Sequence, residues 1–199
     1  MTRIIAGTAR GRRLEVPSRG TRPTSDRIRE ALFSSLDSSA RERGGWADVV
    51  VLDLYAGTGA LGLEALSRGA QRAYLVESGR EAIRALRANI AAVGSDDAVV
   101  IPRTVASVVG EPPGPTATLV LADPPYDVPA DRLAGELERL VSLGWIRAGA
   151  EIVVERPTRD GHCPLPADWE LLRERAYGDT TLWYGRVQRR GAVAEEERD

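Results

Sequence analysis

From residue 49 onward, short apolar runs alternate with longer segments in which apolar residues recur every three or four positions. The short runs are typical of buried strands, and the longer segments are typical of helices that pack on a sheet. We predict strands over residues 49–54, 72–77, 98–101, 117–123 and 151–155. We predict helices over residues 60–68, 80–93, closed by Gly94, and about 130–142. Strands that alternate with helices indicate a mostly parallel sheet covered on both faces.

Both ends of the chain depart from this alternation. Residues 169–175 and 180–188 are strand-like runs joined by a short turn, close enough to pair antiparallel. Near the N-terminus, two strand-like runs flank residues 7–11, which predicts a β-hairpin with basic side chains at its turn. Thr24 or Ser25 can cap a helix that follows, since the next apolar positions have helical spacing. We expect four parts: a basic hairpin extension (1–20), a linking helix (21–45), an α/β domain (46–190) and a disordered acidic tail (191–199).

Composition narrows the class of protein. The 199 residues are 43% hydrophobic and 28% charged with a net charge of −2, which indicates one globular domain with a packed core. No apolar run approaches the roughly 18 residues of a membrane span, and the N-terminus lacks a secretory leader, so we predict a cytoplasmic protein without membrane contact. Cys163 is the single cysteine and His162 the single histidine of the sequence, so we expect no disulfide and no metal site.

A glycine-rich loop stands between the first strand and the first helix of the alternation. Gly57, Gly59 and Gly62 form a G-x-G-x-x-G pattern, and Glu77 ends the next strand 20 residues beyond Gly57. Such glycines allow a tight turn and the close approach of a ligand, while a carboxylate at that distance can accept both hydroxyls of a ribose. We therefore predict a nucleoside cofactor held by Asp53, Tyr55, Ala56, Gly57, Thr58, Gly59, Glu77 and Ser78.

Asp53 bears on the identity of that cofactor, because we place it at the mouth of the pocket. A carboxylate there would repel the pyrophosphate of a dinucleotide, whereas S-adenosylmethionine brings a cationic sulfonium and an ammonium group. The alternative is that Asp53 is a strand-end carboxylate that caps the following loop.

A second motif, Asp123-Pro124-Pro125-Tyr126, follows the apolar strand at residues 117–123. Loops that leave the carboxyl ends of parallel strands form the ligand crevice, so this loop should face the glycine loop. The amino group of a nucleobase is a poor nucleophile, and Asp123 together with the Pro124 carbonyl can each accept one of its N–H groups. Pro124 and Pro125 stiffen the loop, and Tyr126 can stack on a base turned out of its helix. The alternative is a Pro-Pro turn with an incidental Asp and Tyr.

The two motifs together resemble the S-adenosylmethionine-dependent methyltransferases that modify amino groups of nucleic-acid bases. Residues 3–12 and 22–33 sharpen the likeness, and up to about residue 188 the chain resembles the bacterial small-subunit rRNA guanine-N2 methyltransferases of the RsmD type. The resemblance implies an α/β fold of class I methyltransferase type, Rossmann-like and doubly wound. Its mostly parallel sheet would carry a C-terminal antiparallel strand pair, with a small N-terminal β-hairpin and helix added.

The resemblance also implies ligands and partners. S-adenosylmethionine would be the cofactor, held by Gly57, Gly59 and Glu77, and residues 123–126 would bind the target guanine. The partner would be small-subunit rRNA or a partly assembled small ribosomal subunit, bound by a monomer. Thr24 would lie near the cofactor pocket or the target. Such enzymes often place a polar or acidic side chain near the adenine after the third strand, but this chain departs from that pattern with Ile101-Pro102-Arg103-Thr104, so either backbone groups or Thr104 would contact the adenine.

RNA contact is expected from the N-terminal arginines. Residues 1–30 carry eight arginines against three acids, whereas the rest of the chain is acidic, and arginine suits bidentate phosphate contacts. The candidates are Arg3, Arg10, Arg12, Arg13, Arg22 and Arg27. For Thr24 and Arg27, a helix cap and a surface salt bridge are equally open.

Two other functions remain open. Asp-Pro-Pro-Tyr also resembles the motif of DNA adenine-N6 and cytosine-N4 methyltransferases, although about 45 N-terminal residues leave little room for a DNA recognition domain. DNA as a secondary substrate therefore stays open. The third candidate is a non-catalytic rRNA-binding assembly factor, because a fold alone does not establish an activity.

Overall fold

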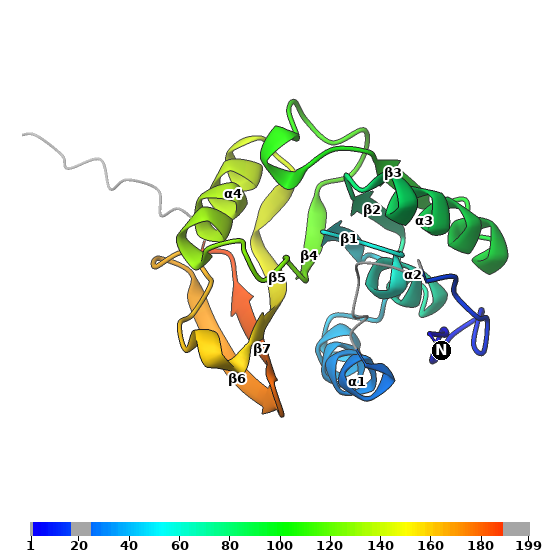
Figure 1. The fold of residues 1–199 in the computed structure, drawn as a ribbon, viewed down its shortest axis with the longest axis horizontal. Coiled ribbons are helices and arrows are strands. Elements are labelled where there is room, and N and C mark those ends of the chain that lie inside the picture. The colour runs from blue at the N-terminus through cyan, green and yellow to red at the C-terminus, as the bar shows by residue number, and fades with distance from the viewer. Residues whose placement is uncertain (1, 17–24, 189–199) are drawn as a thin grey trace, which may run out of the picture.

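A computed structural model describes residues 2–16 and 25–188. Within these residues, seven strands form one sheet in the order β3-β2-β1-β4-β5-β7-β6 (Figure 1). The strands are β1 (Val50–Leu54), β2 (Arg72–Val76), β3 (Ala98–Ile101), β4 (Ala117–Ala122), β5 (Ile146–Pro157), β6 (Glu170–Tyr177) and β7 (Thr180–Arg186). The helices are α1 (Asp26–Glu42), α2 (Ala60–Ser67), α3 (Arg80–Val93) and α4 (Ala130–Ser142), with short 3-10 turns η1 (Val105–Ser107) and η2 (Thr158–Asp160).

The strand directions confirm the predicted sheet. Strands β1 to β5 pair parallel, while β7 pairs antiparallel with both β5 and β6. The chain runs outward from β1 to β3 and then returns to place β4 on the other side of β1, so the order reverses between these two strands. Leu54 pairs with Ala122, which sets the loops that follow β1 and β4 side by side. Ligands of open α/β sheets bind at such a reversal.

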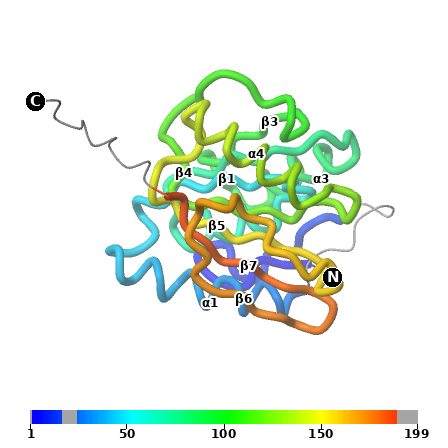
Figure 2. Tube along the Cα trace, turned by 90° about the vertical axis from the view of Figure 1, so that its left-hand side faces the viewer, coloured from blue at the N-terminus to red at the C-terminus, as the bar shows by residue number. Residues whose placement is uncertain are grey.

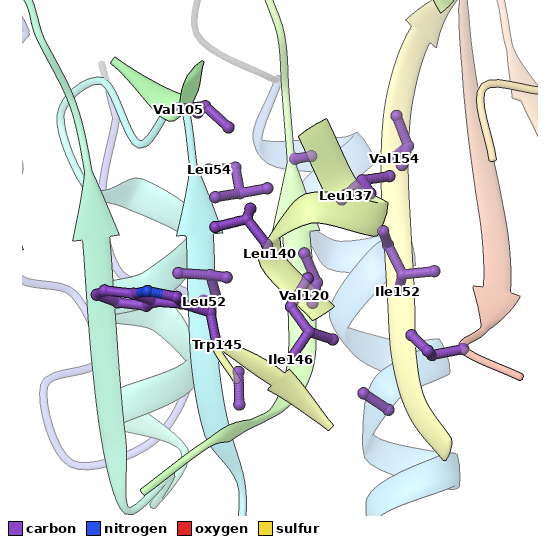
Figure 3. Close-up of a cluster of buried hydrophobic side chains, with 14 of the residues drawn as sticks. Leu52, Leu54, Val105, Val120, Leu137, Leu140, Trp145, Ile146, Ile152 and Val154 are labelled. Carbon is purple, nitrogen blue, oxygen red and sulfur yellow. The ribbon is translucent and has the colours of Figure 1, made fainter. Parts of the chain in front are cut away.

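The two faces of the sheet bury different helices. Alternate side chains of β1, β4 and β5 point toward α4, as Leu52, Val120 and Ile152 do in Figure 3. The other face buries α1, α2 and α3 in a second cluster. Figure 1 shows α4 and α1 on opposite sides of β4 and β5. The predicted covering of both faces is therefore confirmed.

Helix α1 begins as its sequence signals indicate. Ser25 is the N-cap, and its hydroxyl accepts a hydrogen bond from the Ile28 N–H at 3.3 Å. The buried side chains recur at helical spacing and are Arg29, Leu32, Phe33, Leu36 and Ala40. Thr24, the other candidate cap, lies outside the described residues.

Residues 2–16 turn back on themselves as the expected hairpin: an antiparallel bridge joins Arg3 and Arg13, and backbone hydrogen bonds of 2.9 Å link Ile4 to Arg12 and Leu14 to Thr2. The hairpin also contacts α2, where the N–H groups of Ile5 and Ala6 donate to the Glu64 carboxylate at 2.7 and 3.0 Å. A Cβ on Gly7 would lie 1.7 Å from a backbone oxygen of α2, so the turn approaches that helix closely. Figure 2 shows the segment beside α1, and its apolar side chains share the cluster of α1 and α2. The apolar side chains of the N-terminal segment are thus part of the core.

Strand β5 is longer than the apolar run that predicted it. It begins at Ile146 rather than at residue 151, and its pairing with β4 is irregular between Ala117 and Leu119. Gly149, at φ 79°, lies in this interruption, which breaks the apolar pattern of the strand. The predicted acidic tail at 191–199 lies outside the described residues. No helix in the described part of the chain is both long and apolar enough to cross a membrane.

Candidate active site

The glycine loop after β1 has two kinds of glycine. A Cβ on Gly57, at φ 55°, would meet only the Tyr55 carbonyl oxygen at 3.9 Å, so this position faces open space. A Cβ on Gly59 would lie 2.4 Å from Leu86, and one on Gly62 would lie 2.3 Å from Leu75. Gly59 and Gly62 therefore permit close packing of the loop and α2, whereas Gly57 leaves room for a ligand.

The Glu77 carboxylate accepts backbone hydrogen bonds from the glycine loop and from the residues that follow β2. One of its carboxylate oxygens accepts the Gly57 N–H at 2.8 Å, and the other accepts the N–H groups of Ser78 and Gly79 at 2.8 and 2.6 Å. A carboxylate offers about four acceptor positions, so these contacts use most of them. The predicted contact with ribose stays a prediction, and the carboxylate has a structural part in shaping the glycine loop as well.

Asp53 is buried, with 1% of its surface exposed, so its placement at the pocket mouth was wrong. Its carboxylate accepts the Gly62 N–H at 2.9 Å, within the first turn of α2, as expected for the capping alternative. Burial raises the pKa of Asp53 to about 7; the Gly62 hydrogen bond opposes this rise, while the negative charges of Asp123 and Glu77 add to it. Asp53, Asp123 and Glu77 thus lie close together at this edge of the sheet.

The Asp123 motif lies beside this loop at the end of β4. Asp123 is half-buried and Pro124 is buried, whereas Pro125 and Tyr126 are exposed. The Val128 N–H donates to the Pro125 carbonyl at 3.0 Å, which turns the chain toward α4. Tyr126 is 65% exposed, and the Arg159 guanidinium lies 5.8 Å from the centroid of its ring. A carboxylate, a rigid turn and an aromatic ring thus stand next to the glycine loop.

Tyr55 connects the glycine loop to α4. Its backbone is left-handed at φ 60°, and its hydroxyl donates to the Glu136 carboxylate at 2.5 Å. Burial, followed by this hydrogen bond, raises the pKa of Tyr55 above its usual range. Sequence reasoning missed Glu136, although it occupies a core position of α4 between Leu133 and Leu140. The sequence did carry a signal, because helical spacing puts this carboxylate on the same face as the buried leucines.

Comparison with known proteins places the chain in a family. The family model described as conserved hypothetical protein 95 matches residues 2–186. The chain belongs to this family. It is 38% identical to ribosomal RNA small subunit methyltransferase D of Escherichia coli K12, over 99% of this chain and 94% of the relative. The protein of the same name from Haemophilus influenzae is 34% identical, over 88% of this chain and 89% of the relative.

Solved structures agree with this assignment. A structure described as a putative methyltransferase from Escherichia coli matches with a TM-score of 0.78 and 35% identity, over 94% of this chain and 99% of that one. An RNA methyltransferase from Salinibacter ruber, solved with S-adenosyl-L-homocysteine, matches with a TM-score of 0.61 at 15% identity, over 89% of this chain and 100% of that one. The predicted methyltransferase fold is confirmed, and the second likeness concerns the fold alone.

The other residues predicted to bind the cofactor differ in their burial and in their hydrogen bonds. Ala56 is buried and its N–H donates to the Val76 carbonyl at 2.9 Å, and the buried Thr58 accepts from Asn89 through its carbonyl at 2.9 Å. Ser78 is exposed beside Glu77. Thr104 is exposed at the start of η1, where its hydroxyl contacts Ser107 at 2.8 Å. Ala56 and Thr58 therefore contribute to the loop's internal structure.

The predicted RNA-binding arginines that the structure describes are all exposed: Arg3, Arg10, Arg12, Arg13 and Arg27. Within residues 2–16 and 25–188, none of them forms an ion pair, so their guanidinium groups are accessible to phosphate. Arg29 differs, because it is buried and donates to the Arg3 carbonyl at 2.7 Å and to Asp26 at 2.8 Å. Arg22 lies outside the described residues.

Substitution of the two loop glycines should separate binding from stability. Gly59→Ala should lower the free energy of unfolding by about 2–4 kcal/mol, because the added methyl combines left-handed backbone strain with overlap on Leu86. Gly57→Ala should cost only the backbone strain, about 1–2 kcal/mol, but should weaken S-adenosylmethionine binding at least tenfold by filling the open space. Urea unfolding and calorimetric titration measure the two effects. Equal affinity of Gly57→Ala and the unaltered protein would refute a ligand at this position.

Proposed function

We propose that the protein transfers a methyl group from S-adenosylmethionine to the exocyclic N2 amine of a guanine in small-subunit rRNA. The observation that carries this proposal is the Asp123-Pro124-Pro125-Tyr126 turn beside the open glycine loop at the β1–β4 reversal. The names of the relatives support the choice of RNA, since they are called ribosomal RNA small subunit methyltransferase D.

The site suits this cofactor on two counts. Gly57 leaves room for close approach of a ligand, and Asp53, Glu77 and Asp123 provide negative charge for a sulfonium and an ammonium group. When bound, S-adenosylmethionine supplies an electrophilic methyl group on its sulfur. Glu77 would accept hydrogen bonds from the ribose hydroxyls, and the Gly57–Gly59 turn would contact the nucleoside, as is typical of such loops.

Asp123 and Pro124 act on the amine. The Asp123 carboxylate and the Pro124 carbonyl each accept one N–H, which directs the nitrogen lone pair toward the methyl group. The neutral amine is too weakly acidic to lose its proton first, so Asp123 accepts that proton late, as the N–C bond forms and the bond from the methyl carbon to sulfur breaks. Tyr126, exposed at the rim, stacks on the guanine. The chain's own contribution is therefore position and proton acceptance.

A partly assembled small ribosomal subunit is the substrate we favour. A short basic segment suits RNA whose shape already presents the target, and sequence-specific duplex reading would need more protein. The test is transfer of a labelled methyl group to subunits, naked rRNA and DNA, followed by nucleoside digestion. We expect label in N2-methylguanosine, strongest with subunits. Label in DNA bases would favour the DNA enzyme instead, and cofactor binding without any transfer would favour the assembly factor.

The exposed N-terminal arginines should set the salt dependence of RNA binding. Replacement of Arg10, Arg12 and Arg13 by Ala should lower the slope of log K against log salt by about 2, since each lost phosphate contact removes about 0.7–0.9. Titration of rRNA at several salt concentrations measures this slope. The matched control replaces Arg80, Arg84 and Arg87, which are exposed on α3, and should leave the slope unchanged. Equal slopes in both triple variants would exclude the N-terminal segment from RNA contact.

A further inference from the structure

An open pocket lies beside Tyr126, on the side of β5 and the β6–β7 turn. Its volume is about 310 Å³, at the lower end of the range of about 300–1,000 Å³ for sites that bind small organic groups. The described residues that line it are Tyr126, Pro157, Thr158, Arg159 and Asp179. Among these lining residues, none comes from the glycine loop, and Asp123 is not one of them. The pocket is therefore a neighbour of the reaction centre.

The wall opposite Tyr126 is fixed by hydrogen bonds between strand ends. The Thr158 N–H donates to the Asp179 carbonyl at 2.8 Å, and the Thr158 hydroxyl donates to the Gly178 carbonyl at 3.0 Å. Arg156 is buried at the end of β5 and holds the Asp160 carboxylate through Nε at 3.0 Å and through a terminal nitrogen at 2.7 Å. These contacts anchor η2 on both sides of Arg159. The backbone that presents Arg159 is thus preorganised.

The lining chemistry suits a nucleobase. The Tyr126 ring borders the pocket, and the Arg159 guanidinium offers a planar group that stacks on bases. The 5.8 Å between the Arg159 guanidinium and the Tyr126 ring is near the outer limit of about 6 Å for a cation–π contact, so this pair is loosely held. The Arg159 guanidinium can therefore stack on the face of a base, while the exposed Asp179 can accept a hydrogen bond from the edge of that base. A phosphate would be repelled by the Asp179 carboxylate. An apolar group would offer no partner to the charges of Arg159 and Asp179.

We propose that this pocket binds an unpaired base next to the methylated guanine, with Arg159 stacked on that base. The inference rests on the proposed function and assigns a second nucleotide position to the same site. The reacting amine itself lies outside the pocket, because it must come within about 2.6–3.2 Å of Asp123, which is not among the described lining residues. Arg159 thereby selects RNA in which the neighbouring base is free to leave its stack.

Steady-state methylation of the RNA substrate tests this role with three variants. Arg159→Ala should raise KM for RNA about tenfold, in the lower part of the range for loss of a base-stacking contact, with kcat and S-adenosylmethionine affinity unchanged. Arg159→Lys should not restore KM, because lysine keeps the charge but lacks the planar group. Arg147→Ala, an equal charge change at the opposite end of β5, is the matched control and should leave KM unchanged. Full rescue by lysine would overturn the stacking role.

A binding cycle with abasic RNA identifies the base. In oligonucleotides that contain the target guanine, one adjacent abasic site should weaken binding about tenfold to the unaltered protein, and should have little effect on Arg159→Ala. If the loss of binding from the abasic site and the loss from Arg159→Ala simply add, at both positions next to the guanine, the inference is overturned. The proposed function would stay intact. Absence of any RNA methylation by the unaltered protein would overturn the proposed function itself, so the two failures are distinguishable.

Discussion

Asp123→Ala is expected to lower the rate of methyl transfer by about 10²–10⁴-fold, the range usual for loss of a positioned acid–base group. The carboxylate lies at the end of β4 next to the glycine loop, where it can accept an N–H of the target amine and then its proton. Removal leaves the amine without that acceptor. Single-turnover transfer of a labelled methyl group measures the loss, and RNA affinity should stay within about threefold of the original, because the arginines supply most of the binding free energy.

Asp123→Asn separates the two parts assigned to this residue. The amide oxygen can still accept an N–H, but the side chain cannot take a proton at neutral pH. A rate near that of the unaltered enzyme would show that orientation suffices and would remove proton acceptance from the mechanism. A loss as large as that of Asp123→Ala would favour proton acceptance. Unchanged activity of Asp123→Ala would contradict the site itself and favour a non-catalytic protein.

Local signals in the sequence were sufficient for most elements of the fold. Helix α3 begins at Arg80 and ends at Val93 as predicted, because Gly94 adopts the left-handed conformation that ends a helix. The meeting of the two motifs was also predictable, since parallel strands bring their carboxyl ends to one edge of the sheet. Such inferences depend on neighbouring residues and on general rules of topology.

Contacts between distant residues were beyond prediction from the sequence. The N-terminal hairpin is held against α2 because Glu64, 59 residues away from Ile5, accepts the Ile5 N–H. The Tyr55–Glu136 hydrogen bond and the contact of Tyr126 with Arg159 likewise join separate elements. A Cβ on Gly62 would lie 3.1 Å from the Asp53 carboxylate, so the glycine lets α2 pack closely over Asp53. A motif identifies such a carboxylate, whereas tertiary packing decides whether solvent reaches it.

The buried position of Asp53 predicts a strong pH dependence of cofactor binding. Its pKa is about 7, so it is largely protonated at pH 6, and a cationic ligand must then bind at the expense of releasing that proton. The affinity for S-adenosylmethionine should therefore rise as the pH increases from 6 to 7, by up to about tenfold per unit, and level off above about 8. Calorimetric titration at each pH measures this rise. Asp53→Asn should abolish it while still accepting the Gly62 N–H, and also controls for titration of the ligand.

The same group should make the free protein less stable as the pH rises. The folded pKa of Asp53 lies above its ordinary value of 3.8, so between about pH 4 and pH 7 the folded state holds more protons than the unfolded state. This contribution is fully present below pH 4 and is lost as the pH passes 7, a decrease of up to about 4 kcal/mol in the free energy of unfolding. In Asp53→Asn the decrease should vanish, so urea unfolding at pH 5 and pH 8 compares the two proteins. An equal pH dependence in both would show that Asp53 titrates near its ordinary pKa, and the predicted dependence of cofactor binding would be lost with it.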